Sequence, residues 1–317
     1  MNVSYFVGYI LGSIPSAVIV TRRVAGVDIR VLGDGNMGAR NVKRSIGWGP
    51  AIVVAAMCFT KGAAAVLLAQ AFGLSVGWQV ASGAAAARAF ARAGCNVGIH
   101  YNASRNRAEE VAADVRLAGG LAHLIGGDMT ESATVRRVID EAAGALGGID
   151  VLVNNVGGLL QRVPLAEIDD AAFDAVVDLN TRSLVMACAA AVPHMRRAGR
   201  GSIVNVTSIA ARNGGGTGAA LYAGAKAFVS TFTRGIAREL VRDNIRVNAV
   251  SPGVIETPFH ERYSTPQMLE TMRATIPMNR LGTADECAGA FLYLASDALS
   301  GYVTGQIIEV NGGQLMP

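Results

Sequence analysis

Cysteine and histidine are scarce in this sequence, with four of each among 317 residues. The cysteines are dispersed at Cys58, Cys95, Cys188 and Cys287. This spacing indicates neither a disulfide framework nor a zinc site. The histidines, at positions 100, 123, 194 and 260, form no ligand cluster either. We therefore expect no metal site.

Acidic residues are nearly absent from the first hundred positions, which contain only Asp28 and Asp34 against nine lysines and arginines. Residues 3–20 carry no charge, and these 18 residues reach the lower limit for a membrane span. Residues 45–87 contain Lys61 as their single charge, which predicts one span around residues 50–72 and a weaker third around residues 74–90. Because Gly, Ala and Ser make these segments only moderately apolar, buried helices of a soluble protein are the alternative.

Basic residues lie between the first two apolar segments. They are Arg22, Arg23, Arg30, Arg40, Lys43 and Arg44. Basic loops of membrane proteins stay in the cytoplasm, so the chain would start outside and three spans would return it to the cytoplasm. No aromatic residues are interleaved with the basic ones. We therefore interpret this loop as facing lipid and expect no binding to nucleic acid.

Three side chains in the second half of the chain point to an active site. Tyr222 and Lys226 are one helical turn apart, which places an ammonium near a phenol and favours the ionised phenol. A phenol with a lowered pKa can exchange a proton with an alcohol or carbonyl oxygen. Ser208 follows a buried strand expected at residues 202–206, at the end where open α/β sheets bind ligands. Taken alone, a Tyr and a Lys at this spacing are more often a surface pair.

Two asparagine positions precede these residues. A buried strand ends in Asn154 and Asn155, whose amides can brace the neighbouring backbone, and Gly157 allows a ligand to approach closely. Asn180 falls within a helix, where its amide could hold a water molecule and link Lys226 to solvent. Each of these could be a satisfied polar group of the core. The whole series in this order favours a catalytic site.

With these motifs, residues 86–317 resemble the short-chain dehydrogenase/reductase family. Asn154-Asn155-Val156-Gly157 is similar to its NNAG motif, and Val310-Asn311-Gly312-Gly313 to its C-terminal signature. The family's catalytic tetrad matches Asn180, Ser208, Tyr222 and Lys226. The resemblance implies reversible hydride transfer between a nicotinamide cofactor and a small carbonyl or alcohol compound. Tyr222 would be the acid/base and Ser208 would polarise the substrate oxygen. Lys226 would lower the tyrosine pKa and hold the nicotinamide ribose, while Asn180 would support a proton relay.

The same resemblance implies a set of cofactor contacts. They are Asp128 beside the adenine, Asn154 and Gly157 after their strand, and Pro252, Gly253 and Thr257 in the loop that begins Ser251-Pro252-Gly253. At the end of a strand expected at residues 96–101, no Asp or Glu is present to bind a ribose 2′-hydroxyl. Asn102, Ser104 and Arg105 could hold a 2′-phosphate there, so we expect NADP(H) rather than NAD(H). The alternative is that Arg105 merely begins a solvated helix.

The family's glycine-rich loop is degenerate in this chain. The TGxxxGIG motif falls on residues 76–83, where Gly77 and Gly83 remain. The bulky Trp78-Gln79-Val80 run is unsuited to a phosphate cradle and favours helix. We therefore expect helix through residues 77–90 and a missing or substituted first strand. A literal GxGxxG at residues 33–38 is rejected, because no acidic residue follows within the roughly 20 positions that a dinucleotide fold requires.

Residues 1–85 resemble a different family. Gly12-Ser13-Ile14-Pro15-Ser16, residues 33–42 and Lys61-Gly62 are similar to the N-terminal part of the membrane-bound acyl-phosphate glycerol-3-phosphate acyltransferases of bacterial phospholipid synthesis. The resemblance implies cytoplasmic loops that bind phosphate and acyl donor. The later His and GGKG loop that completes that site is absent from the sequence. The simplest interpretation is a fusion of a truncated acyltransferase with a reductase.

We therefore predict an α/β fold, a doubly wound parallel Rossmann-type sheet with its first strand missing or substituted, preceded by an apolar membrane-associated helical segment. We expect its strands at residues 96–101, 122–127, 149–154, 202–206, 246–250 and 306–310, with helices at residues 105–117 and 284–295 among those that cover it. An irregular lid, which includes Phe259, should span residues 255–279. The predicted function is that of an NAD(P)-dependent oxidoreductase. An acyltransferase-like membrane protein or an inactive fusion is the alternative. We expect the cell membrane as the location, with the reductase part in the cytoplasm, or else a cytoplasmic protein. The family's long helices imply a homo-oligomer.

Overall fold

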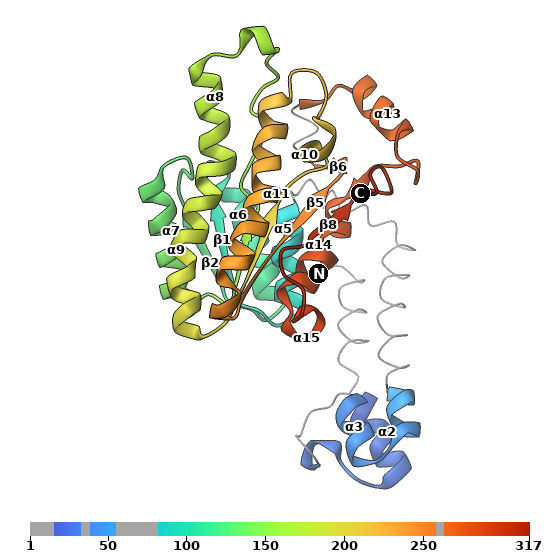
Figure 1. Ribbon diagram of the computed structural model, residues 1–317. Coiled ribbons are helices and arrows are strands. Elements are labelled where there is room, and N and C mark those ends of the chain that lie inside the picture. The colour runs from blue at the N-terminus through green and yellow to red at the C-terminus, as the bar shows by residue number, and fades with distance from the viewer. Residues whose placement is uncertain (1–15, 33–38, 55–81, 258–262) are drawn as a thin grey trace. The chain divides into compact units, whose positions relative to one another are not determined.

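The computed structural model describes residues 16–32, 39–54, 82–257 and 263–317 (Figure 1). The chain divides into two compact units, Met1–Trp78 and Gln79–Pro317. The expected spans at residues 3–20 and 50–72 lie mainly outside the described ranges. The first part of the helix expected at residues 77–90 and most of the degenerate glycine loop at residues 76–83 also lie outside the described ranges.

In the first unit, short helices enclose a small apolar core. They are α2 (Ser16–Ala25), a 3-10 turn (Ile29–Val31), α3 (Ala39–Ser45) and a helix that begins at residue 48. Ile29 and Val42 are fully buried in this core. Asp28 caps the 3-10 turn and pairs with Arg22 and Arg30, and the hydrogen bond from Arg30 holds the pKa of Asp28 well below its usual range.

The described strands of the second unit are all parallel. β1 (Val97–Tyr101) pairs with β2 (Ala122–Gly126). A separate group has the order β3-β4-β5-β8. Its members are β3 (Val151–Asn154), β4 (Gly201–Val206), β5 (Ile245–Pro252) and β8 (Ile307–Val310). These strands confirm the expected ones and lie close to the expected bounds. Within the described ranges, no strand pairing joins β1 to β3.

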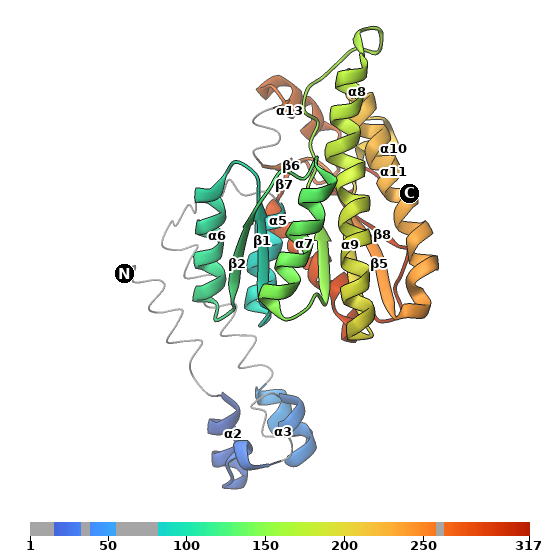
Figure 2. The ribbon, with the colours of Figure 1, turned by 90° about the vertical axis from the view of Figure 1, so that its left-hand side faces the viewer.

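Helices cover both faces of the strands (Figures 1 and 2). One face carries α7 (Ser132–Leu146), α9 (Ser183–Ala198) and α11 (Ala220–Leu240). The other carries α5 (Ser82–Arg92), α6 (Arg105–Leu117) and α14 (Ala284–Ala295). Each helix buries a stripe at helical spacing, such as Val135, Val138 and Ile139 of α7. The two cores on either side of the strands confirm the doubly wound α/β fold.

The helix that contains Asn180 is continuous. α8 (Asp170–Val177) continues through a π-turn (Asp178–Arg182) into α9, so Asn180 lies within a helix as expected. This continuous helix is long and apolar enough to span a membrane by length and composition. Leu184, Ala187 and Met195 are nevertheless buried in the core of the second unit. Its apolar character is therefore explained by packing within the protein.

The third membrane span, expected around residues 74–90, is wrong in its second half. Residues 82–90 belong to α5, which packs against α14 and α6. Ala86 and Ala91 are buried in this packing. Arg88 is also buried, and its guanidinium lies 2.6 Å from the carboxylate of Asp114 on α6. Alanine is apolar enough to resemble a membrane segment, and here its small size lets helices approach closely.

Short elements lie beyond the carboxyl ends of the strands. They are α10 (Ala210–Asn213), β6 (Ile255–Glu256), α13 (Pro266–Ala274) and β7 (Gly282–Thr283). We expected an irregular lid over residues 255–279, and instead a helix and a strand pair order part of it. Figure 1 shows α10 and α13 near the end of β5. These elements therefore flank the edge at which an α/β sheet binds its ligands.

Candidate active site

The sequence-predicted residues meet at the carboxyl ends of β3, β4 and β5. Asn154 ends β3, Ser208 lies just beyond β4, and Pro252 ends β5. The register of these parallel strands brings their ends to one edge of the sheet. The long helix α11 supplies Tyr222 and Lys226 from above β4 and β5. Residues far apart in the sequence are thereby gathered in one place.

Lys226 is buried, with 3% of its surface exposed. Its Nζ donates a hydrogen bond to the Val206 carbonyl at 2.9 Å and lies 5.8 Å from the centre of the Tyr222 ring. Among the described residues, no acidic side chain forms an ion pair with it. Burial therefore lowers the pKa of Lys226 to about 8.

Tyr222 differs from our expectation. Lys226 was expected to lower its pKa, but burial raises the pKa of Tyr222 to about 12. A hydrogen bond from Ser208 partly opposes this effect. The ring is partly buried, and the Lys226 ammonium donates its hydrogen bond to the Val206 carbonyl on β4. Desolvation of the phenolate therefore decides the direction of the shift in the Tyr222 pKa.

Asn180 lies on the π-turn and is fully buried. Its Nδ2 donates to the Gly158 carbonyl, and its Oδ1 accepts the Gly158 amide, both at 2.9 Å. A Cβ atom at Gly157 would lie 2.8 Å from both the Asn180 Oδ1 and the Lys226 Nζ. Only glycine therefore allows the loop after β3 to pass so close to these two side chains. The structure brings Asn180, Gly157 and Lys226 together, as the sequence suggested.

Asn154 faces inward rather than toward a ligand. Its Nδ2 donates to the Asn205 Oδ1 at 2.9 Å, and Asn205 in turn donates to the Thr233 hydroxyl on α11 at 2.9 Å. All three side chains are buried. Sequence reasoning missed Asn205 and Thr233, because a single polar residue in an apolar strand or helix carries no indication of its partner. This network braces β3, β4 and α11 beneath the site.

The glycines expected at the cofactor behave differently from one another. A Cβ atom at Gly83 would lie 2.7 Å from the Asn155 side chain, so this glycine allows α5 to pack against the loop after β3. At Gly253 a Cβ atom would lie 2.7 Å from that of Asn311, where the end of β5 meets the end of β8. Gly77 lies outside the described residues. Gly83 and Gly253 therefore allow close packing near the carboxyl ends of β3, β5 and β8.

The residues expected around the cofactor's adenosine end are exposed. Arg105 begins α6, and its Nε lies 3.0 Å from Glu109. Asp128 accepts hydrogen bonds from the amide and hydroxyl of Thr130, and the amide bond lowers the pKa of Asp128. Ser104 is the N-cap of α6 but makes no capping bond with its side chain. Asn102 and Ser104 are also exposed and lie near Arg105 in the chain, just after the carboxyl end of β1.

Comparison with known proteins agrees with this geometry. The family model described as enoyl-(acyl carrier protein) reductase matches residues 80–314. The chain belongs to the short-chain dehydrogenase/reductase family. A second family model, glycerol-3-phosphate acyltransferase, matches residues 3–115. The two matches overlap at residues 80–115, which the structure places in the reductase unit.

Characterised reductases are similar along most of their length. The chain is 37% identical to a 7α-hydroxysteroid dehydrogenase of Clostridium sardiniense, over 73% of this chain and 88% of that protein. It is 35% identical to a 3-oxoacyl-[acyl-carrier-protein] reductase of Staphylococcus aureus, over 71% of this chain and 90% of that protein. A solved NADH-dependent reductase of alginate metabolism is 38% identical, with a TM-score of 0.69 over 75% of this chain and 94% of that one.

The reductase unit has an apolar pocket against Tyr222. Its apolar lining includes Leu159, Leu160, Ala172, Ala175, Val176 and Leu221. Leu160 has a φ of 61°, a left-handed conformation that is unusual for leucine and is often found at functional sites. Sequence reasoning missed this pocket, although the apolar pair after Gly157-Gly158 was a signal that could have indicated it.

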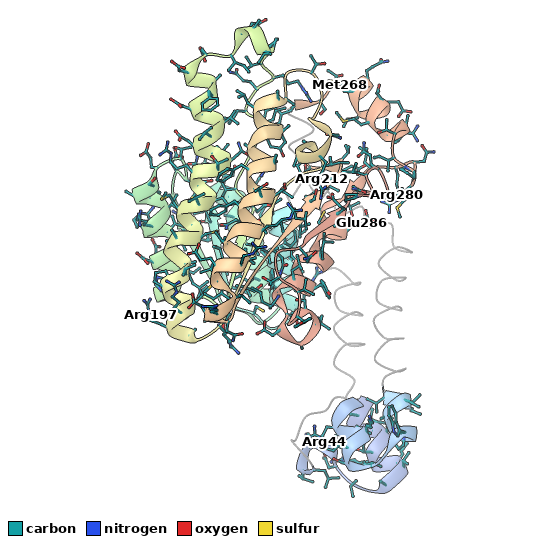
Figure 3. The ribbon with its side chains drawn as sticks, in the orientation of Figure 1. Arg44, Arg197, Arg212, Met268, Arg280 and Glu286 are labelled. Carbon is teal, nitrogen blue, oxygen red and sulfur yellow. The ribbon has the colours of Figure 1, made fainter. Side chains whose placement is uncertain are left out.

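Two arginine contacts hold the lid segment, one at Tyr263 within it and one at Arg280 just after it. The Nε of Arg162 donates to the Tyr263 carbonyl at 3.3 Å, and Arg280 pairs with Glu286 at the start of α14 at 2.6 Å (Figure 3). Phe259, which we expected in the lid, lies outside the described residues.

Within the described ranges, no group of His, Cys, Asp and Glu side chains is placed to hold a metal ion.

We predict that Lys226→Met removes a pH dependence of stability. The pKa of Lys226 falls from 10.5 to about 8 on folding, so between these values the unfolded chain binds more protons and the free energy of unfolding rises with pH. The change over this window is roughly 3 kcal/mol. The free-energy cost of burying the charged amine is present in full below pH 8. Lys226→Met should therefore be more stable than the wild type at pH 7. Urea unfolding from pH 7 to 10.5 measures this, with Lys43→Met as the exposed control. Parallel profiles for the wild type and Lys226→Met would contradict it.

Proposed function

We propose that the reductase unit transfers hydride between a nicotinamide cofactor and a carbonyl or alcohol compound. The observation that carries this proposal is the convergence of Ser208, Tyr222 and Lys226 at the carboxyl edge of the sheet. A bound nicotinamide would supply or accept the hydride. Ser208 donates a hydrogen bond to the substrate oxygen, and Tyr222 exchanges the proton with it.

The protonation state of Tyr222 favours carbonyl reduction. With its pKa at about 12, the phenol is protonated at neutral pH and can act as an acid. Alcohol oxidation needs the phenolate, which requires the Lys226 amine to approach as an ammonium. With its pKa at about 8, that amine is charged at neutral pH. Asn180, fixed by Gly158 beside Lys226, supports the relay of protons toward solvent.

The residues around the site fit a dinucleotide at its nicotinamide end. Lys226 and Tyr222 would hold the ribose, and Gly157, Pro252, Gly253 and Thr257 would flank the ring. We propose NADP(H) as the preferred cofactor, because Asn102, Ser104 and the exposed Arg105 stand at the end of β1, where no acidic residue could bind a 2′-hydroxyl. The degenerate loop at residues 76–83 would weaken the hold on the pyrophosphate.

The pocket beside Tyr222 supports an apolar substrate. Its small size and aliphatic lining suit a short hydrocarbon part of a carbonyl compound next to the reacting oxygen. The relatives named above act on a steroid and on an acyl-carrier-protein substrate by their descriptions. We propose a small carbonyl compound with an apolar arm.

A homo-oligomer through the long helices α9 and α11 is also part of the proposed function, because Phe228 on α11 is exposed and stacks on Phe232.

The acyltransferase match supports a second candidate function for the first unit. We propose that it attaches the chain to the cell membrane while the reductase unit stays in the cytoplasm. Two crossings with a cytoplasmic basic loop would put the reductase unit outside, and α5 no longer supplies a third. Because the nicotinamide pool is cytosolic, we propose attachment without this pair of crossings, so that the reductase unit stays on the cytoplasmic side. A cytoplasmic protein without attachment, and an inactive fusion, are the alternatives.

Tyr222→Phe should reduce carbonyl reduction by roughly a hundredfold or more, because it removes the acid while preserving the ring. The assay follows NADPH and NADH oxidation with a panel of aliphatic and aromatic ketones and aldehydes. Tyr302→Phe, at a fully exposed tyrosine, is the control and should keep wild-type activity. Equal activity of Tyr222→Phe and the wild type would contradict the assigned site.

Arg105→Ala should weaken NADPH binding about tenfold and leave NADH binding unchanged, since it removes a charge-assisted contact to the 2′-phosphate alone. Fluorescence titration of the nucleotides measures both constants. Arg107→Ala, an exposed arginine of the same helix, is the matched control. Tighter binding of NADH than NADPH to the wild type would overturn the preference. A chain whose unfolding temperature rises with neither nucleotide would support the inactive fusion.

In intact cells that contain the chain, the reductase unit should be protected from protease added to the medium. Membranes isolated from these cells are then assayed for acyl transfer from acyl phosphate to glycerol 3-phosphate. We expect no transfer, because the loop that completes the acyltransferase site is missing. Acyl transfer that Asn36→Ala abolishes would instead establish an acyltransferase function for the first unit. Cleavage of the reductase unit in intact cells would contradict its cytoplasmic location.

A further inference from the structure

Lys226 is bonded to the carboxyl end of β4 and the residue after it through both its side-chain amine and its main-chain carbonyl. At the tip, its Nζ donates to the Val206 carbonyl at 2.9 Å. At the base, its own carbonyl accepts a hydrogen bond from the Thr207 hydroxyl at 2.8 Å. Two consecutive residues of one strand segment therefore hold the main chain and the amine of the same lysine.

A second hydroxyl completes the attachment at the base. The Ser230 Oγ lies 2.8 Å from the Thr207 Oγ1 and 3.1 Å from the Lys226 carbonyl. Thr207 and Ser230 are both buried, with 2% and 7% of their surfaces exposed. The Thr207 and Ser230 hydroxyls can thus form hydrogen bonds with each other and with the Lys226 carbonyl, without a water molecule. Burying polar groups is costly unless they are paired in this way.

The periods of strand and helix explain why these positions meet. Asn205 and Thr207 are two residues apart and lie on the same face of the strand. On α11, Lys226, Ser230 and Thr233 follow the spacing of one helix face. The lower link, from Asn205 to Thr233, is a side-chain amide to a hydroxyl. The upper link, at Thr207, is the one that holds Lys226 itself.

We propose that Thr207 and Ser230 are positioning residues, whose hydroxyl pair fixes the base of Lys226 so that its amine can leave the Val206 carbonyl and still remain beside Tyr222. The role in catalysis rests on the proposed reductase function. Thr207 also precedes Ser208, so the same bond sets the separation of β4 and α11 at the point where Ser208 and Tyr222 form their hydrogen bond.

The test compares Thr207→Val with Thr207→Ser in the full chain. Valine keeps the shape and loses the hydroxyl, and serine keeps the hydroxyl. For ketone and aldehyde reduction, we expect kcat to fall about tenfold in Thr207→Val, because a small misplacement of a catalytic group costs rate. KM should change little, and Thr207→Ser should retain wild-type kcat. Ser202→Ala removes another buried hydroxyl of β4, bonded to the Leu294 carbonyl, and is the control for stability alone.

A second readout does not depend on activity. The sequence has three lysines, Lys43, Lys61 and Lys226, so modification by acetic anhydride at pH 8 can be followed at each by mass spectrometry. Release of its base should raise the labelling rate of Lys226 about threefold or more in Thr207→Val, through local opening. Lys43 serves as the internal reference. Neither Thr207→Ser nor Ser202→Ala should change the rate.

The outcomes separate this proposal from the proposed function. If the wild type reduces no carbonyl compound but labelling of Lys226 rises only in Thr207→Val, the reductase function fails and the positioning role stands. If Thr207→Val matches Ser202→Ala in kcat and in labelling, the positioning role is overturned. Should Thr207→Val not fold, Ser230→Ala takes its place, because it keeps the Thr207 bond and removes the second hydroxyl. Its labelling rate should then lie above that of the wild type, and an unchanged rate would overturn the proposal.

Discussion

Burial of the Lys226 amine without an acidic partner among the described residues is the constraint on which the site depends. Moving an amine out of water is costly, and here one hydrogen bond to the Val206 carbonyl replaces its hydration. The lowered pKa expresses this cost. A buried amine that lowers the stability of the fold indicates a functional site, because side chains with perturbed pKa values are frequent at active sites. The elements that surround the Lys226 side chain accommodate it.

Two departures from regular structure follow from that constraint. The loop after β3 passes so near Lys226 that position 157 accepts only glycine. The helix opposite it contains a π-turn at Asn180, and such turns are frequent at functional sites. Its amide is fixed on both sides by Gly158. The loop, the π-turn and the lysine therefore support one another, and a change in any of them would disturb the other two.

The two family matches overlap at residues 80–115, and this segment contains the alanine-rich helix α5. In the structure, the small side chains of α5 allow close contact with α6 and α14. Gly83 similarly keeps a packing role against Asn155. Gly83, at the end of the degenerate glycine motif, thus contributes to the packing of the reductase core.

Strand and helix positions in the reductase unit could be predicted because apolar periodicity is local, and α6 and α14 begin and end where the pattern predicted. The order Asn180, Ser208, Tyr222, Lys226 likewise predicted a site, since each follows a strand or lies on a helix above one. Partners could not be predicted. The bonds from Asn154 to Asn205 and from Thr207 to Lys226 join residues distant in the chain. The direction of the Tyr222 pKa also depended on burial, which exists only once α11 is packed against the sheet. The sequence by itself determined the fold class and the chemical groups, because these depend on short-range pattern and composition. The tertiary structure decided their contacts and ionisation, because desolvation and hydrogen bonding arise from neighbours that only folding brings together.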